Sequence, residues 1–248
     1  MEFILNYYFD FGLMFDEFGF VLDGFWVTLK LSLIGGVCSL IWGLVLAVLR
    51  QLPGRAFLPV RVVVIAYIDV FRGIPVLLIL LLLSGFLGSA ANEGVIPDSI
   101  GLPRWFGESD PFWYGVMGLT ITYGAYMAEV YRAGIEAVPY GQAEAARSLG
   151  MSQGQTMRYV IVPQAVRKVI PPLLNDFIAL MKDTSLVSVL GLLEVVQAGR
   201  DIQSEFLNGS GLVLGALFFL AVTIPLARVI DRLIAHQQAR YERQTGLA

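Results

Sequence analysis

Long apolar runs dominate this sequence, over roughly 25–49, 60–87, 112–131 and 211–230. As a helix that rises about 1.5 Å per residue, each can cross a hydrocarbon core of about 30 Å. A less regular stretch, 169–196, is interpreted as one further, interrupted span. Only 15% of the residues are charged, whereas soluble domains have about a quarter. The sequence therefore predicts an all-α integral membrane bundle, one domain with five transmembrane helices.

Charged residues between these spans predict the orientation, because basic residues favour cytoplasmic loops. Basic residues gather after the first span, after the third span and in the tail, at Arg50, Arg55, Arg61, Arg132, Arg147, Arg158, Arg167, Lys168, Arg228, Arg232, Arg240 and Arg243. Acidic residues gather in the other connections, at Asp10, Asp16, Glu17, Asp23, Glu93, Asp98, Glu108, Asp110, Glu194, Asp201 and Glu205. We expect the N-terminus outside, the C-terminus in the cytoplasm, and a cytoplasmic loop over 136–163.

Several function classes are disfavoured by composition. A net charge of −3 does not indicate a nucleic-acid partner. One cysteine and one histidine cannot form the cluster of a typical metal site, so we expect no bound metal. The phosphate-binding pattern G-x-x-x-x-G-K-[ST] is absent, and no catalytic set of residues appears. We therefore expect no enzyme activity and no cofactor on this chain, with energy supplied by a partner.

The cytoplasmic loop combines helix-forming residues with helix breakers. Pro139 and Gly141 indicate a turn, and Gln142 to Leu149 favour a short helix. Gly150 suits the left-handed position that closes a helix. Ser152 is a suitable N-cap for a second short helix, which we expect to end before Pro163.

Two interpretations of this loop remain open from spacing alone. Ala145 and Ala146 leave a surface that another protein can approach closely. A solvated amphipathic connector between two spans explains the same residues.

The run EAARSLGMSQGQTMRYVIVP resembles the EAA motif of the membrane subunits of ATP-binding-cassette importers. That motif requires E-A-A, three residues, Gly, nine residues and Ile-x-Leu-Pro. The residues at these positions are Glu144, Ala145, Ala146, Gly150 and Pro163, with Val160 and Val162 in place of Ile and Leu. The resemblance implies the type I importer permease fold and a coupling helix that sits in a cleft of the ATPase subunit. The residues it assigns to coupling are Gln142, Glu144, Ala145, Ala146, Leu149, Gly150 and Met151.

Further segments resemble the polar amino acid uptake permeases of bacterial inner membranes: FRGIPVLL, AYMAEVYRAGI and VPQAVRKVIPPLLNDFIALMKDTSLVS. This resemblance extends over residues 22–200. It implies two ATPase subunits that bind ATP and Mg, a second permease chain, identical or paralogous, and an extracytoplasmic amino-acid-binding protein. The implied mechanism is alternating access, in which closure of the ATPase subunits moves the coupling helices. Methionine or another small solute is an alternative cargo, and a passive channel is a more distant alternative.

Polar residues within the predicted spans are candidates for the cargo path. Asp183, Thr184 and Ser185 lie past the midplane of the interrupted span, where charges usually face a cavity or a partner. A structural ion pair across a subunit interface is the alternative. Asn175 and Asp176 lie closer to the cytoplasm and are interpreted as contacts within the bundle.

The second span carries a further candidate. Arg72 and Asp69 can pair on one helix face, and Arg72 is also a candidate path residue. Gly73 and Pro75 loosen or kink the helix, which forms either a gate hinge or a structural irregularity. In the third span Glu129 and Arg132 have the spacing of an interfacial pair.

Overall fold

The computed structural model describes residues 2–245, with side chains described for 4–235, and all regular elements in that range are helical. The elements are α1 (Glu2–Tyr8), α2 (Phe11–Asp16), α3 (Phe18–Arg50), η1 (Arg55–Phe57), α4 (Leu58–Gly73), α5 (Val76–Asn92), α6 (Asp98–Gly101), η2 (Trp105–Gly107), α7 (Asp110–Glu136), α8 (Tyr140–Ser148), α9 (Gln153–Thr156), η3 (Met157–Ile161), α10 (Val162–Asp183), η4 (Thr184–Leu190), α11 (Val195–Phe206) and α12 (Ser210–Thr245). The predicted all-α class is confirmed.

Helices α3 and α7 cross closely because small residues stand at their contact. A Cβ added to Gly43 would lie 2.9 Å from the carbonyl oxygen of Gly124. One added to Gly124 would lie 2.5 Å from Cδ1 of Trp42. Backbones approach this closely in membrane bundles where glycine faces the partner helix, so the two helices form the central scaffold.

The main apolar core surrounds this scaffold. Leu31 of α3, Leu119 of α7, Leu180 of α10 and Leu80 of α5 are all fully buried in one cluster. Four helices that are distant in sequence are therefore held by one set of van der Waals contacts, the kind of packing that joins helices in a membrane.

A second cluster joins the ends of the chain. Val21, Phe25 and Met181 pack with Val195 and Leu214, which come from α11 and α12. The first helices are fixed to the same region, since the amide of Gly209 donates to the carbonyl of Tyr7 at 2.8 Å and the amide of Asp10 donates to the Ser210 hydroxyl at 2.9 Å.

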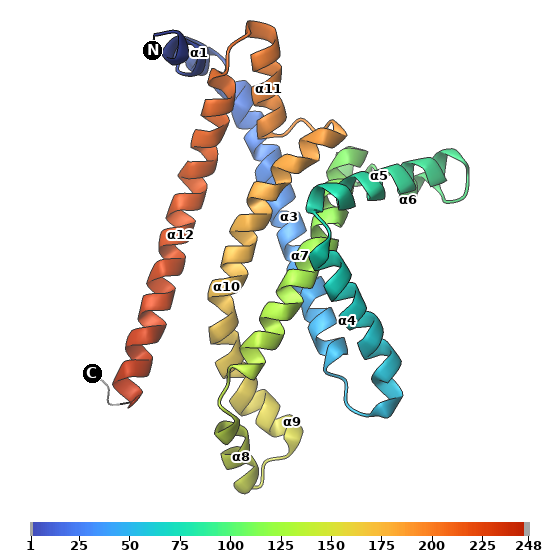
Figure 1. Ribbon diagram of the computed structural model, residues 1–248, viewed down its shortest axis with the longest axis vertical. Coiled ribbons are helices and arrows are strands. Elements are labelled where there is room, and N and C mark those ends of the chain that lie inside the picture. The colour runs from blue at the N-terminus through green and yellow to red at the C-terminus, as the bar shows by residue number, and fades with distance from the viewer. Residues whose placement is uncertain (1, 246–248) are drawn as a thin grey trace.

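The long helices run between two ends of an elongated molecule (Figure 1). Helices α1 and α11 lie at one end, and α8 and α9 lie at the other, near the end of α12. The loop predicted to be cytoplasmic and the C-terminal end of α12 thus lie at the same end of the molecule, opposite the N-terminal helices.

The second predicted span, 60–87, is not one straight helix. Helix α4 ends at Gly73, α5 begins at Val76, and the two meet at 110°. Pro75 causes the break, because it has no amide to donate and forces the preceding residue, Ile74, out of the helical conformation, to φ −96° and ψ 131°.

By length and composition, two helices in the described part of the chain can cross a membrane, Phe18–Arg50 and Ser210–Ala235, or three crossings if the bent pair of α4 and α5 is one span. The predicted spans 112–131 and 169–196 are largely helical, in α7 and in α10 with η4, but do not meet the same criteria. Five crossings and their orientation stay a prediction.

Candidate coupling loop and translocation path

Helix α8 ends in the conformation expected from Gly150. This residue has φ +84°, its amide donates to the Arg147 carbonyl at 2.9 Å, and the amide of Met151 donates to the Ala146 carbonyl at 3.2 Å. These two bonds form a Schellman cap, which satisfies carbonyls left free at the helix end. The predicted left-handed helix end is confirmed.

A reciprocal cap starts the next helix. The amide of Gln155 donates to the Ser152 hydroxyl at 3.3 Å, and the amide of Ser152 donates to the Gln155 side chain at 2.9 Å. Ser152 is therefore the N-cap that the sequence predicts. The abrupt chain reversal between α8 and α9 is fixed on both sides by local hydrogen bonds.

Two details of the predicted loop are wrong. Gly141 lies inside α8 rather than in a turn, because the helix begins at Tyr140 directly after Pro139. Pro163 does not end the second helix. It occupies the first turn of α10, where a missing amide is tolerated, and the π turn η3 connects α9 to it without a break.

The loop presents some of the expected coupling residues and buries another. Leu149 is 84% exposed and Tyr140 is 75% exposed, while Ala146 is only 4% exposed. Gln142, Glu144, Ala145 and Gly150 are exposed, and Met151 is half-buried. Ala146 is thus not part of an approachable surface, because α8 packs with that side against η3. The exposed Tyr140 was missed because it precedes the motif.

An ion network joins the C-terminal ends of α3 and α7. Glu129 binds Arg132 at 2.7 Å, as its spacing predicts, and also binds Arg50 of α3. Arg132 additionally binds Glu136 at 2.6 Å. Hydrogen bonds to Glu129 and Glu136 raise the pKa of the Arg132 guanidinium above its ordinary value, so it stays charged. The network sits next to the coupling loop, which follows Glu136 in the chain.

Asp183 lies where α10 changes into η4, and α7 holds its carboxylate. The hydroxyl of Tyr123, which is 5% exposed, donates to Oδ2 of Asp183 at 2.8 Å. Thr184 is fully buried and donates to the Met181 carbonyl at 2.7 Å, and Ser185 donates to the Lys182 carbonyl at 2.7 Å. The two hydroxyls therefore complete the helix end, which leaves the half-buried Asp183 and the exposed Lys182 as the charged groups of this segment.

A second carboxylate shares the region. Oδ2 of Asp176 is buried and has no hydrogen-bond partner within the described chain. Asp176 interacts electrostatically with Arg72 of α4 and with Tyr123. The interpretation of Asp176 as a contact within the bundle is therefore not supported by a bond.

Arg72 points to α7 rather than to Asp69. Its guanidinium lies 5.6 Å from the ring centre of Tyr126, whose hydroxyl donates to the Arg72 carbonyl at 3.2 Å. Among the ion pairs of described residues, none joins Arg72 to Asp69, so the predicted pair is not formed. The aromatic face of Tyr126 competes for the guanidinium. Sequence reasoning missed both tyrosines, since only their i, i+3 spacing hinted at a shared face.

The polar side chains of α4, α7 and α10 thus form one cluster, which we call the polar cluster: Arg72, Tyr123, Tyr126, Asp176 and Asp183. It lies beside the break between Gly73 and Pro75, and it carries both signs of charge. Chemically it can bind a small molecule that has an ammonium and a carboxylate group.

Known proteins resemble the chain over most of its length. Residues 39–243 match the family described as binding-protein-dependent transport system inner membrane component. The probable glutamine ABC transporter permease protein GlnM of Bacillus subtilis is 35% identical, over 93% of this chain and 99% of that protein. The glutamate/aspartate import permease protein GltK of Escherichia coli is 35% identical, over 79% of this chain and 83% of that protein.

Solved structures share the fold. A crystal structure of an amino acid ABC transporter with histidines superposes with a TM-score of 0.77 at 33% identity, covering 90% of this chain and 96% of that chain. An inward-facing MetNI methionine ABC transporter gives 0.66 at 18% identity, covering 88% and 98%, which shows the fold alone. This chain belongs to the family of binding-protein-dependent inner membrane components, the permease subunits of ABC transporters.

Proposed function

We propose that this chain is the permease subunit of an ATP-driven importer of polar amino acids. The observation that carries the cargo class is the polar cluster, in which Asp183 and Asp176 offer negative charge and Arg72 offers positive charge. An amino acid zwitterion needs both. The names of the relatives, which concern glutamine, arginine and glutamate, support the same class.

We further propose that two ATPase subunits, which bind ATP and Mg, dock at the α8–α9 loops of a permease dimer. Leu149 and Tyr140 support this, because large apolar side chains exposed at this level on a polar loop favour a protein partner. The chain reversal at Gly150 gives the loop a fixed shape that can fit a cleft of the ATPase. The small side chain of Ala145 lets the ATPase approach the helix closely.

A second permease chain, identical or paralogous, completes the path in this proposal. Asp69 and Arg72 are exposed on α4, beside exposed apolar residues such as Val63 and Val70. Charged groups at membrane depth are stable only against water or protein. A partner chain that covers this face would enclose the polar cluster between the two copies.

The proposed topology has five crossings, an extracytoplasmic N-terminus and a cytoplasmic C-terminus. Figure 1 supports it, since α1 and the end of α12 lie at opposite ends of the molecule. Cargo arrives from an extracytoplasmic binding protein. Closure of the ATPase subunits on ATP draws the coupling loops together and turns the path outward, and hydrolysis returns it. Gly73 and Pro75 give α4 and α5 a hinge for this motion.

Uptake into proteoliposomes tests the cargo class. The full transporter, with permease, ATPase and binding protein, is loaded with ATP inside and offered a panel of labelled amino acids that includes methionine. ATP-dependent uptake of a polar amino acid is the expected result. If methionine were the only amino acid taken up, the proposed cargo class would be wrong. If uptake continued without ATP, the chain would be part of a channel and not of an importer.

A further inference from the structure

A cavity of about 570 Å³ lies between the C-terminal ends of α3 and α7 and the start of α10. Its lining comes from residues within 44–53, from residues within 157–169, and from Tyr131 and Ile135 of α7. We call this cavity the apolar groove. Its volume is within the range of small-molecule sites, about 300–1,000 Å³.

The side-chain donors of this lining are already engaged. Nε2 of Gln51 donates to the Ala47 carbonyl at 3.2 Å, and the hydroxyl of Tyr131 donates to the Leu40 carbonyl at 3.3 Å. Most of the other lining residues are aliphatic. The groove therefore suits a hydrocarbon chain better than a polar cargo.

The groove opens beside the exposed apolar residues of a helix that can cross the membrane. Helix α3 is long and apolar enough for a crossing, and its lining residues Leu44 and Val48 are exposed, as is Val166 of α10. Exposed apolar side chains on such a helix are in contact with acyl chains unless protein covers them. An acyl chain of the bilayer can therefore enter the groove without first crossing water.

The two main lining segments carry only basic charges. Neither 44–61 nor 151–168 contains an acidic residue. Their basic residues are Arg50, Arg55, Arg61, Arg158, Arg167 and Lys168. The nearby acids of α7, Glu129 and Glu136, already bind arginines. Basic residues between helices at the end of a membrane span favour anionic lipid headgroups.

Three arginines place this charge at the groove. Arg61 donates from Nη2 to the carbonyl of Gly54 at 3.2 Å, directly after the last lining residue of the α3 side. Arg55 follows Gly54, and Arg158 is exposed and adjoins a lining residue of η3. No ion pair between described residues involves any of these three arginines, so no carboxylate neutralises them.

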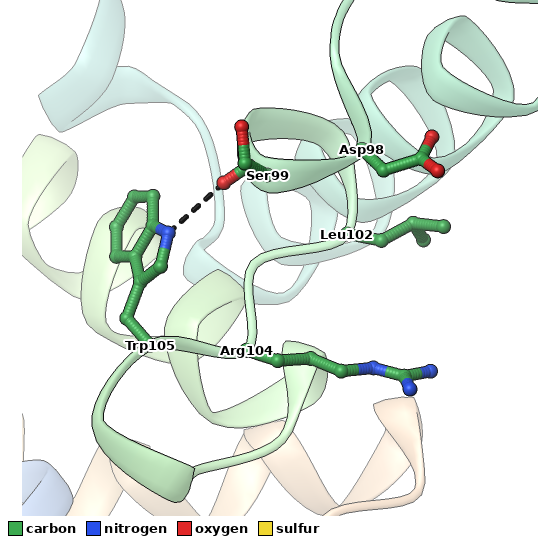
Figure 2. A pocket seen from close by; sticks show the side chains of 5 residues that line it. All are labelled: Asp98, Ser99, Leu102, Arg104 and Trp105. Carbon is green, nitrogen blue, oxygen red and sulfur yellow. Dashed lines mark hydrogen bonds between the residues drawn. The ribbon is translucent and has the colours of Figure 1, made fainter.

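A second pocket, in the connection between α5 and α7, has a different charge (Figure 2). Its lining residues are Asp98, Ser99, Leu102, Arg104 and Trp105. The carboxylate of Asp98 would repel an anionic headgroup, and Arg104 already has Asp110 at 3.9 Å. The apolar groove is thus distinguished by basic charge beside an apolar lining.

We propose that the apolar groove binds an acyl chain of an anionic phospholipid, whose phosphate lies against Arg55, Arg61 and Arg158. In the proposed topology this lipid belongs to the cytoplasmic leaflet. Met157 of η3 lines the groove, and η3 joins α9 to α10. The lipid therefore contacts the segment that the coupling loop moves in the proposed mechanism.

The first test titrates the delipidated complete transporter with phosphatidylglycerol or phosphatidylcholine and counts bound lipids by native mass spectrometry. Phosphatidylglycerol should bind one site per permease chain about tenfold or more tightly than phosphatidylcholine. Arg55→Gln and Arg158→Gln should each weaken this site about fivefold, the contribution of one basic residue near an anionic lipid. The matched control is Arg104→Gln, the same charge loss at the second pocket, which should change the affinity less than about twofold.

The acyl chain is tested separately. Val48→Trp fills the groove and should weaken phosphatidylglycerol binding about tenfold. Val37→Trp is the same substitution at an exposed residue of α3 outside the lining and should leave binding unchanged. Equal affinities for the two lipids would overturn the proposal, and so would equal effects of the two tryptophan substitutions.

A crosslinker identifies the occupant of the groove. Val166 is replaced by the photo-crosslinker p-benzoylphenylalanine, and the transporter is placed in nanodiscs that contain equal amounts of the two lipids. Predominant crosslinking to phosphatidylglycerol supports the proposal. Equal crosslinking to both lipids shows ordinary bilayer contact and overturns it, as does a crosslink to a second permease chain. These negative outcomes leave the importer function intact, because uptake into proteoliposomes tests that function independently.

Discussion

Gly150→Ala should weaken the coupling loop through backbone conformation alone. Nothing lies within 4 Å of an added Cβ, so no steric clash contributes, but φ is +84°. A left-handed conformation costs an L-residue about 1–2 kcal/mol relative to glycine. That loss corresponds to roughly a 5- to 30-fold increase in the open form of the loop. Hydrogen exchange of the Leu149 and Met151 amides should speed up by the same factor, and amino acid uptake per ATP hydrolysed should fall.

Two variants isolate the cause. Gly150→Asn should exchange more slowly than Gly150→Ala, because asparagine tolerates the left-handed region. Gly141→Ala places the same methyl group in the first turn of α8, where nothing lies within 4 Å of it and the helical backbone conformation suits alanine. If Gly150→Ala and Gly141→Ala gave equal exchange and equal uptake, the reasoning from the left-handed cap would be refuted.

Four further substitutions have defined outcomes. Asp183→Asn should lower uptake across a panel of amino acids while the ATPase still assembles with the permease. Tyr123→Phe should have a smaller effect: it should lower uptake about 10-fold, because one hydrogen bond to a charged group is lost. Gly43→Ala should destabilise the α3–α7 crossing by about 1–3 kcal/mol, seen as a lower thermal midpoint in detergent. Glu194→Ala should raise exchange at the start of α11 by removing the fully buried side chain that caps its first amides, at about 0.5–2 kcal/mol.

For three of these substitutions one result would contradict the prediction. Unchanged uptake in Asp183→Asn would remove this residue from the cargo path. Gly85→Ala is the control for Gly43→Ala, since an added Cβ at Gly85 meets nothing within 4 Å, and equal midpoints would argue against a close crossing. If hydrogen exchange at the start of α11 were as slow in Glu194→Ala as in the unmodified protein, the cap would contribute nothing to stability.

Local backbone features were predictable from the sequence. Gly150 and Ser152 act through bonds that reach only three to five residues, so a short segment contains all of the information that their conformations need. Glu129 and Arg132 pair for the same reason. The apolar runs predicted the long helices because the hydropathy of a segment depends only on its own residues and not on the segments that pack against it.

Contacts between distant segments were not predictable in this way. Tyr123 and Asp183 are 60 positions apart, and their hydrogen bond depends on how α7 crosses α10. Whether Ala146 faces a partner or η3 depends on the packing of α8, which its own residues do not determine. The sequence predicted a loosened or kinked helix at Gly73 and Pro75 but not the 110° bend, because a proline predicts a break and not its angle.

Because the chain does not break at Pro163, the proposed coupling loop and Asp183, the proposed cargo carboxylate, are joined by one run of helical turns. The five residues of η3 and the 22 of α10 follow one another without a gap, with Pro171 and Pro172 inside α10, and at about 1.5 Å per residue they extend over at most roughly 40 Å. A tilt of about 10° at the loop end would displace Asp183 by roughly 7 Å, more than the width of a hydrogen-bonding shell. In the proposed mechanism the length of this helical run would enlarge the movement of the ATPase at Asp183, and the hydrogen bond from Tyr123 is the contact that this movement would have to break.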